Sequence, residues 1–226
     1  MFKFLLITLL VIQVYGKPWD PIPNGPEWLL RHKLLIDQTI IHKTEEQIVF
    51  VGDSITDFWT LGQGRDVWAK YYANRHAFNY GISGDRTENV VYRIQNKEFD
   101  GLKPKVTVVM IGTNNIPLKE STEDIAKGVE EIVRELLAKM PETKVILLGV
   151  LPRGLPLGNI CKELNTLIKK LDNQKNVFWL DMWSAFEGTD GDVKHELFNL
   201  DKLHPNHEGY VVWQKTMEPL LQKLLQ

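Results

Sequence analysis

The chain has 226 residues, of which 43% are hydrophobic and 25% charged, and its formal net charge is -2. Such a size and composition are typical of one globular domain with a well-filled core. The near-neutral charge gives no electrostatic reason to expect nucleic acid or an anionic membrane as a partner. The single cysteine, Cys161, excludes an intrachain disulfide framework and a cysteine-built metal site.

The N-terminus carries a short apolar stretch. Lys3 precedes an uncharged run, rich in Leu, Ile and Val, that extends from Phe4 to Gly16. Compact residues stand at its end, where a signal peptidase cleaves, so residues 1–16 are predicted to be a secretory signal removed near Gly16. The alternative is a membrane anchor, but the run is shorter than the roughly 20 residues that span a bilayer. We therefore expect a secreted protein without stable membrane insertion.

Residues 17–26 contain four prolines and are predicted to be an extended N-terminal linker. Residues 27–226 are predicted to form a single domain, because no repeat, low-complexity stretch or second linker follows.

The rest of the chain alternates between helical and strand patterns. Short apolar runs predict strands at residues 48–51, 77–80, 106–111, 145–150 and 177–180. Amphipathic patterns predict helices at residues 27–41, 66–72, 87–96, 121–140 and 160–171, and at 207–225 with an interruption at Pro219. This order predicts an α/β fold, a three-layer α/β/α sandwich around a five-stranded parallel sheet. Its functional site is expected at the carboxyl ends of the strands.

Ser54 is the first candidate catalytic residue. It follows the first predicted strand in the stretch QIVFVGDSITDFW and opens an amphipathic pattern. A serine at this place can act as a nucleophile, or it can simply cap the helix. Asp53 can orient the turn or cap the helix itself. Thr56 stands where the nucleophile elbow of α/β-hydrolases needs a glycine, which excludes that motif.

A serine nucleophile needs a base and an acid that orients the base. Asp201 lies three residues before His204, in a loop that precedes the last predicted helix. The alternative is a surface histidine beside a capping aspartate. His207 is near enough to compete, but it lacks an acid at the same offset and we expect it to be exposed.

Oxyanion donors form the third group. Gly84 follows the second predicted strand and Asn114 follows the third. With the amide of Ser54 they would supply three hydrogen-bond donors to a tetrahedral intermediate. Taken singly, a turn glycine and a helix-capping asparagine are the more ordinary explanations of the two positions. The ordered set of serine, glycine, asparagine and Asp-x-x-His favours catalysis.

These blocks resemble a known family. GDS at Ser54, the turn ending in Gly84, GTNN at Asn114 and DKLH at Asp201–His204 are similar to the four signature blocks of the SGNH (GDSL-type) esterases. VFVGDSITDFW, FNYGISGDRT and DKLHPNHEGY resemble, within that family, the catalytic subunits of platelet-activating factor acetylhydrolase isoform Ib. The similarity covers essentially the whole chain from Trp28 onward.

The resemblance implies a flavodoxin-like sheet and a role for each candidate. Ser54 would be the nucleophile, His204 the general base, Asp201 its partner, and Gly84 and Asn114 oxyanion donors with the Ser54 amide. It implies no cofactor and no metal, and a shallow acyl pocket in which Ile55 and Leu203 would favour a short acyl group.

The resemblance also implies a homodimer and a regulatory WD-repeat partner, but the predicted signal peptide argues against that partner. The predicted function is hydrolysis of short-chain, acetyl-type esters such as acetylated phospholipids. One alternative is a secreted carbohydrate O-acetylesterase, and another is a non-catalytic secreted binding protein of the same fold. Arg153 would meet a charged substrate group or lie in a surface turn.

Overall fold

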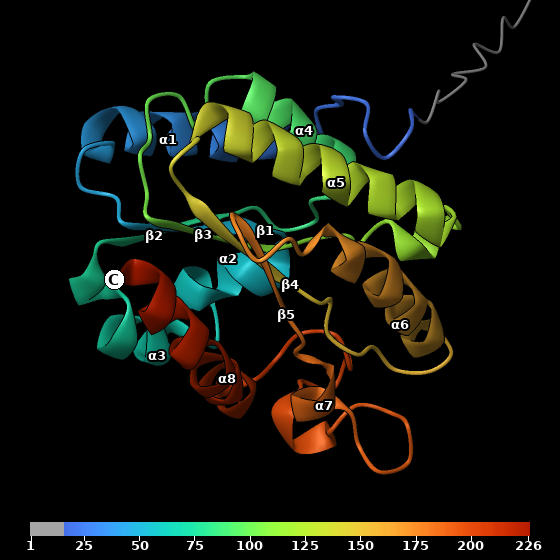
Figure 1. Cartoon of the computed structure of the whole chain (residues 1–226). Helices are drawn as coiled ribbons and strands as arrows, with labels where there is room; N and C mark the ends of the chain where they lie inside the picture. The colour runs from blue at the N-terminus through green and yellow to red at the C-terminus, as the bar shows by residue number, and fades with distance from the viewer. Residues whose placement is uncertain (1–15) are drawn as a thin grey trace, which may run out of the picture.

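The computed structural model describes residues 16–226, so the predicted signal segment lies outside the described residues except for Gly16. Its centre is a parallel sheet with the strand order β2-β1-β3-β4-β5 (Figure 1). The strands are β1 (Ile48–Gly52), β2 (Ala77–Gly81), β3 (Val106–Met110), β4 (Lys144–Leu148) and β5 (Val177–Leu180).

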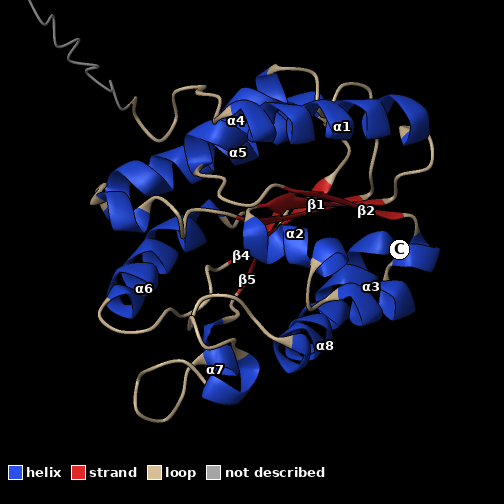
Figure 2. Ribbon diagram, turned by 180° about the vertical axis from the view of Figure 1, so that it is seen from behind, coloured by secondary structure: helices blue, strands red, loops and turns tan. Residues whose placement is uncertain are grey.

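Helices cover both faces of the sheet, as the view from behind shows (Figure 2). The α-helices are α1 (Pro26–His42), α2 (Ser54–Leu61), α3 (Arg65–Tyr71), α4 (Thr87–Gln95), α5 (Thr122–Lys139), α6 (Leu157–Ile168), α7 (Trp183–Phe186) and α8 (His207–Leu225). Single 3-10 turns lie at η1 (Ala73–Arg75), η2 (Ile116–Leu118), η3 (Lys169–Leu171) and η4 (His195–Leu197). The predicted three-layer α/β/α sandwich is confirmed.

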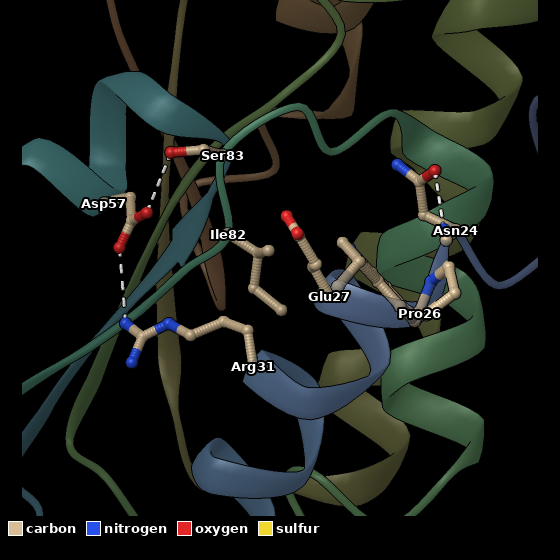
Figure 3. Close-up of a pocket in the computed structure, with 9 residues that line it drawn as sticks. Asn24, Pro26, Glu27, Arg31, Asp57, Ile82 and Ser83 are labelled. Carbon is tan, nitrogen blue, oxygen red and sulfur yellow. Dashed lines mark hydrogen bonds and ion pairs between the residues drawn. The ribbon is translucent and has the colours of Figure 1, made fainter.

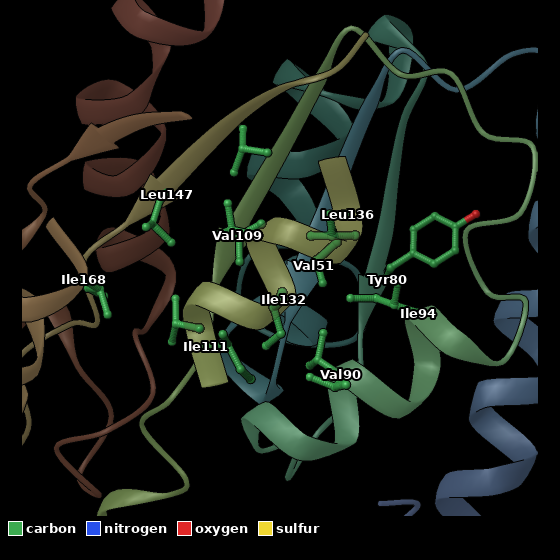
Figure 4. Packing of buried hydrophobic residues seen from close by; sticks show 14 of the residues in the cluster. Val51, Tyr80, Val90, Ile94, Val109, Ile111, Ile132, Leu136, Leu147 and Ile168 are labelled. Atoms are coloured by element: carbon green, nitrogen blue, oxygen red, sulfur yellow. The ribbon is translucent and has the colours of Figure 1, made fainter. Parts of the chain in front are cut away.

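Alternate residues of each strand enter two separate hydrophobic clusters, because side chains alternate between the faces of a sheet. Val49 and Val51 pack with α1, α4, α5 and α6, and part of this cluster is shown in Figure 4. Ile48 and Phe50 pack with α2, α3 and α8 on the other face. Burial on both faces explains why the strands are continuous apolar runs rather than alternating patterns.

The order of the strands fixes where a site can form. From β1 the chain moves to β2 on one side, then crosses to β3 on the other. The carboxyl ends of β1 and β3 therefore border the point where the strand order reverses, which is where open α/β sheets bind ligands. The loops that carry Ser54 and Asn114 both start there.

The last helix differs from its prediction. The prediction of an interruption at Pro219 is wrong, since α8 runs without a break from His207 to Leu225 with Pro219 inside it. The rest of this helix supplies Trp213, Met217 and Leu221 to the core, and this burial outweighs the hydrogen bond that a proline cannot donate. Among the described helices, none is long and apolar enough to cross a bilayer.

The proline-rich segment 17–26 lies against the domain. The amide of Ile22 donates to the carbonyl oxygen of Glu88, and Asn89 Nδ2 donates to the carbonyl oxygen of Ile22. Lys17 Nζ pairs with Asp124 on α5 at 3.0 Å. The segment thus crosses α4 and α5 before α1 begins.

Candidate active site

Ser54 is the first residue of α2, directly beyond the end of β1. Asp53 occupies the N-cap position, where its Oδ1 accepts a hydrogen bond from the Ile55 amide at 2.9 Å. The capping role is therefore filled by Asp53, and the Ser54 hydroxyl is free for another partner. At the first helical position the Ser54 N–H has no intrahelical acceptor, so it can donate to a ligand.

Three predicted residues form one hydrogen-bonded chain. Ser54 Oγ lies 2.8 Å from His204 Nε2, and His204 Nδ1 lies 2.7 Å from Asp201 Oδ2. The first pair joins residues that are 150 positions apart in the sequence. With the Nδ1 proton held by Asp201, the Nε2 lone pair faces the serine hydroxyl, which is the arrangement that deprotonates a serine.

The Asp201–His204 loop is held by its own backbone. Asp201 Oδ1 accepts hydrogen bonds from the amides of Leu203 and His204, each at 3.0 Å. The left-handed backbone of Lys202, with φ of 52°, makes this tight turn. The carbonyl oxygen of His204 accepts from the Asn199 amide at 2.9 Å. These contacts aim the imidazole ring at Ser54.

The electrostatics of Asp201 suit an orienting acid. Partial burial acts to raise the pKa of Asp201, but the hydrogen bond from the His204 side chain and those from two backbone amides outweigh it and lower the pKa below its ordinary value. Asp201 therefore stays ionised, and it can stabilise a positive charge on His204. His207 is exposed, as predicted.

Gly84 lies in a tight turn after β2. The Asp85 amide donates to the carbonyl oxygen of Ile82 at 3.1 Å, which closes a β-turn, and Gly84 has φ of +83°. A type II turn needs such a value at its third position, and glycine takes it without strain. Asn114 Nδ2 donates to the carbonyl oxygen of Asp85 at 2.8 Å. The second amide proton of Asn114 remains for a ligand.

The same turn is tied to α2 and α1 on its other side. Ser83 Oγ donates to Asp57 Oδ2 at 2.8 Å, and Arg31 Nη2 pairs with Asp57 Oδ1 at 3.2 Å (Figure 3). These residues border a cavity of about 620 Å³, also lined by Glu27 and Ile82. None of the candidate catalytic or oxyanion residues lines this cavity, which lies on the α1 side of the turn.

The predicted acyl pocket is corrected in part. Ile55 is only 2% exposed, because its side chain packs in the core cluster with Trp59 and Tyr210. It therefore offers almost no surface to a substrate. Leu203 is half-buried next to His204, and its contact with an acyl group stays a prediction.

Two other polar residues take structural positions. Arg153 Nη1 donates to the carbonyl oxygen of Thr113 at 2.8 Å, so it ties two loops of the sheet edge together. Burial raises the pKa of Asp53 to about 7, although the hydrogen bond from the Ile55 amide opposes the shift. Asp53 both caps α2 and fixes the turn that presents Ser54. Within residues 16–226 no group of three or more His, Cys, Asp or Glu side chains could hold a metal ion.

Comparison with protein-family profiles assigns the chain to a family. A profile described as "GDSL-like Lipase/Acylhydrolase family" matches residues 50–212, a range that contains all of the candidate catalytic residues. The chain belongs to the GDSL-like lipase/acylhydrolase family. The predicted resemblance to SGNH (GDSL-type) esterases is thereby confirmed, and the chain is a carboxylic ester hydrolase.

Curated relatives of this GDSL-like hydrolase align with most of its length. The human platelet-activating factor acetylhydrolase IB subunit alpha2 is 35% identical over 213 residues, which cover 92% of this chain and 89% of the relative. The human subunit alpha1 is 30% identical over 213 residues, covering 92% and 88%.

Solved structures with the same fold include a GDSL-like lipase from Bacteroides thetaiotaomicron, with a TM-score of 0.70 and 20% identity over 85% of this chain and 97% of that one. An acetylxylan esterase from Geobacillus stearothermophilus has a TM-score of 0.61 and 17% identity over 79% and 94%. At such low sequence identities, these structural similarities show only that the fold is shared.

Proposed function

We propose that this GDSL-like hydrolase removes short acyl groups, acetyl above all, from esters through an acyl-enzyme. The observation that carries the proposal is the hydrogen-bonded chain from Ser54 through His204 to Asp201. His204 Nε2 takes the proton of Ser54 Oγ as the oxygen attacks the ester carbonyl. His204 returns the proton to the leaving alcohol, then activates a water that releases the acid.

The oxyanion would lie between the amides of Ser54 and Gly84 and the side chain of Asn114. Loss of one such donor lowers the rate by about 10²–10³-fold in other serine hydrolases. The acyl group would point toward Leu203, which is half-buried next to His204.

The preference for acetyl and for an acetylated phospholipid rests on the relatives, whose names state platelet-activating factor acetylhydrolase. A second candidate is a carbohydrate O-acetylesterase, since an acetylxylan esterase shares the fold. A non-catalytic binding protein is disfavoured by the geometry, because the triad distances of 2.8 and 2.7 Å leave no break in the set.

The first experiment measures kcat/KM on the p-nitrophenyl esters of acetate, butyrate and octanoate. We expect the acetate to be the best substrate and the octanoate to be at least tenfold poorer. Equal or greater activity on the octanoate would contradict the short-acyl part of the proposal. Ser54→Ala serves as the control for mechanism, and retained turnover in that variant would contradict the acyl-enzyme route.

The leaving group is tested separately. Acetate release is followed from an acetylated phospholipid and from acetylated xylan at equal concentrations of ester. Faster release from the phospholipid is expected. Release from the xylan alone would favour the carbohydrate O-acetylesterase.

We also propose that the protein is secreted after cleavage behind Gly16. The run of uncharged residues from Phe4 to Gly16 supports this proposal. A secreted enzyme would be separated from a WD-repeat partner inside the cell, whereas secretion does not prevent the expected homodimer. Mass spectrometry of the protein from the medium of expressing cells should give a chain that starts at Lys17.

A further inference from the structure

The oxyanion turn is held by a buried charged network that the catalytic steps do not use. Asp85 follows Gly84 and is 0% exposed. Its Oδ1 accepts a hydrogen bond from Trp28 Nε1, and its Oδ2 pairs with the guanidinium of Arg93. Its carbonyl oxygen accepts the 2.8 Å hydrogen bond from Asn114 Nδ2. The amide of Asp85 thus closes the turn that contains Gly84, and its carbonyl oxygen binds the side chain of Asn114.

The network also reaches the frame of the fold. Arg93, on α4, is 0% exposed and donates through Nε to Glu98 Oε1 at 2.9 Å. A second nitrogen of Arg93 donates to the carbonyl oxygen of Tyr80 in β2. Glu98 Oε2 lies 2.5 Å from His32 Nδ1 on α1. Asp85 is therefore fixed to α1, α4 and β2 at once.

We propose that Trp28 and Arg93 are positioning residues, which act through Asp85 to hold the Gly84 amide and the Asn114 side chain at the oxyanion. This inference rests on the proposed function. Donors that are fixed before the reaction stabilise the transition state more than donors that must first be oriented. On one side the turn is held by Ser83, which donates to Asp57, whereas at Gly84 an added Cβ would meet nothing within 4 Å.

A purely stabilising role explains the network less well. Replacing a buried ion pair by apolar side chains of similar size is often neutral for stability. Here the guanidinium of Arg93 pairs directly with Asp85, the residue after Gly84, and the hydrophobic cluster on this face is already extensive. The placement of the donors is the feature that an apolar replacement could not supply.

The main experiment compares Trp28→Phe with Trp213→Phe. Trp28→Phe keeps an aromatic ring against His32 but removes the N–H that binds Asp85. Trp213 is 0% exposed in α8, and its Nε1 has no hydrogen-bond partner among the described residues, so Trp213→Phe controls for the loss of ring volume. Both variants are assayed with p-nitrophenyl acetate, and their melting temperatures are measured.

We expect Trp28→Phe to lower kcat by about tenfold with KM unchanged, a part of the 10²–10³-fold effect of losing a whole donor. The inhibition constant of a trifluoromethyl ketone, which forms a reversible tetrahedral adduct with the serine, should rise by a similar factor. Trp213→Phe should keep both values within twofold even where its melting temperature falls as far. Equal kcat and inhibition constants in the two variants would overturn the proposal.

Asp85→Asn provides a second test. Asn at this position can still accept from Trp28 but places an amide against Arg93, so it should reduce kcat more than Trp28→Phe does. If the variant does not fold, the Trp28→Phe comparison decides by itself. A wild-type chain that hydrolyses no ester would refute the proposed function, whereas an active wild type with an unaffected Trp28→Phe would refute only the positioning role.

Discussion

Glu46 carries a buried carboxyl group just before the amino end of β1, whereas Ser54 follows the carboxyl end of that strand. It is 1% exposed, its Oε1 accepts a hydrogen bond from the Tyr80 hydroxyl at 2.8 Å, and its Oε2 has no partner among the described residues. Burial raises the pKa of Glu46 to about 7, although the hydrogen bond from Tyr80 acts in the opposite direction. Because the folded protein binds this proton more tightly than the unfolded chain, raising the pH costs stability.

We predict that this loss occurs as the pH rises from about 4.5 to about 7 and is absent in Glu46→Gln. A shift of this size corresponds to at most about 3 kcal/mol in the free energy of unfolding. Urea unfolding at pH 5 and pH 8 measures it, and wild type should lose more stability between the two than the variant does. Glu130→Gln, at an exposed position on α5, controls for the change in net charge. Equal pH slopes in wild type and Glu46→Gln would contradict the prediction.

At the level of single residues, the sequence predicts the groups that follow strand ends. Ser54, Gly84 and Asn114 stand directly after predicted strands, and Asp201 lies at a fixed offset from His204. The contact between Trp28 and Asp85 joins residues that are 57 positions apart, and no periodic pattern connects them. The burial of Ile55 was missed for a similar reason, since its direction depends on how α2 packs over the sheet.

Two glycines at the end of β2 constrain the elements around the site in different ways. A Cβ at Gly81 would lie 2.3 Å from the backbone nitrogen of Asp57 in α2, whereas a Cβ at Gly84 would meet nothing within 4 Å. Gly81 therefore allows α2 to lie directly against the strand. At Gly84 a glycine is required by the left-handed backbone of the turn, with φ of +83°, and not by a close neighbour.

We predict that Gly81→Ala destabilises the protein by about 3 kcal/mol or more and lowers kcat by over tenfold, because it pushes the start of α2 and with it Ser54. Gly84→Ala should cost only about 1–2 kcal/mol, the strain of a side chain in the left-handed region. Urea unfolding and p-nitrophenyl acetate turnover measure both variants. Similar losses of stability in the two would show that α2 can move away from β2 without cost.

Packing between elements is also what limits prediction of the fold. Strand and helix positions follow from apolar periodicity, and all five predicted strands are found. The unbroken α8 across Pro219 could not be predicted, because the contacts of Trp213, Met217 and Leu221 with the core become visible only in the folded chain.

At the scale of the whole molecule, the segment 17–26 completes one face. Pro18 is buried, and its carbonyl oxygen would lie 2.5 Å from a Cβ at Gly128 in α5. Hydrogen bonds join Ile22 to the backbone of Glu88 and to the side chain of Asn89 on α4. The segment also leads into α1, which carries Trp28.

Truncation tests whether this segment is part of the domain. A chain that starts at Lys17 keeps all of these contacts, so its melting temperature and its turnover of p-nitrophenyl acetate should equal those of the longer chain. A chain that starts at Gly25 loses the hydrogen bonds of Ile22 and uncovers the seam between α4 and α5. We expect it to be less stable by about 1–3 kcal/mol, which corresponds to roughly 2–12 °C for a domain of this size.

The shorter chain should also lose activity. Without the preceding segment the first turn of α1 is less well anchored, and Trp28 in that turn donates to Asp85 beside Gly84. We therefore expect kcat to fall in parallel with that of Trp28→Phe while KM stays constant. A chain from Gly25 with unchanged stability and kcat would show that residues 17–24 are a linker without a structural role, and that α1 holds the oxyanion turn without their help.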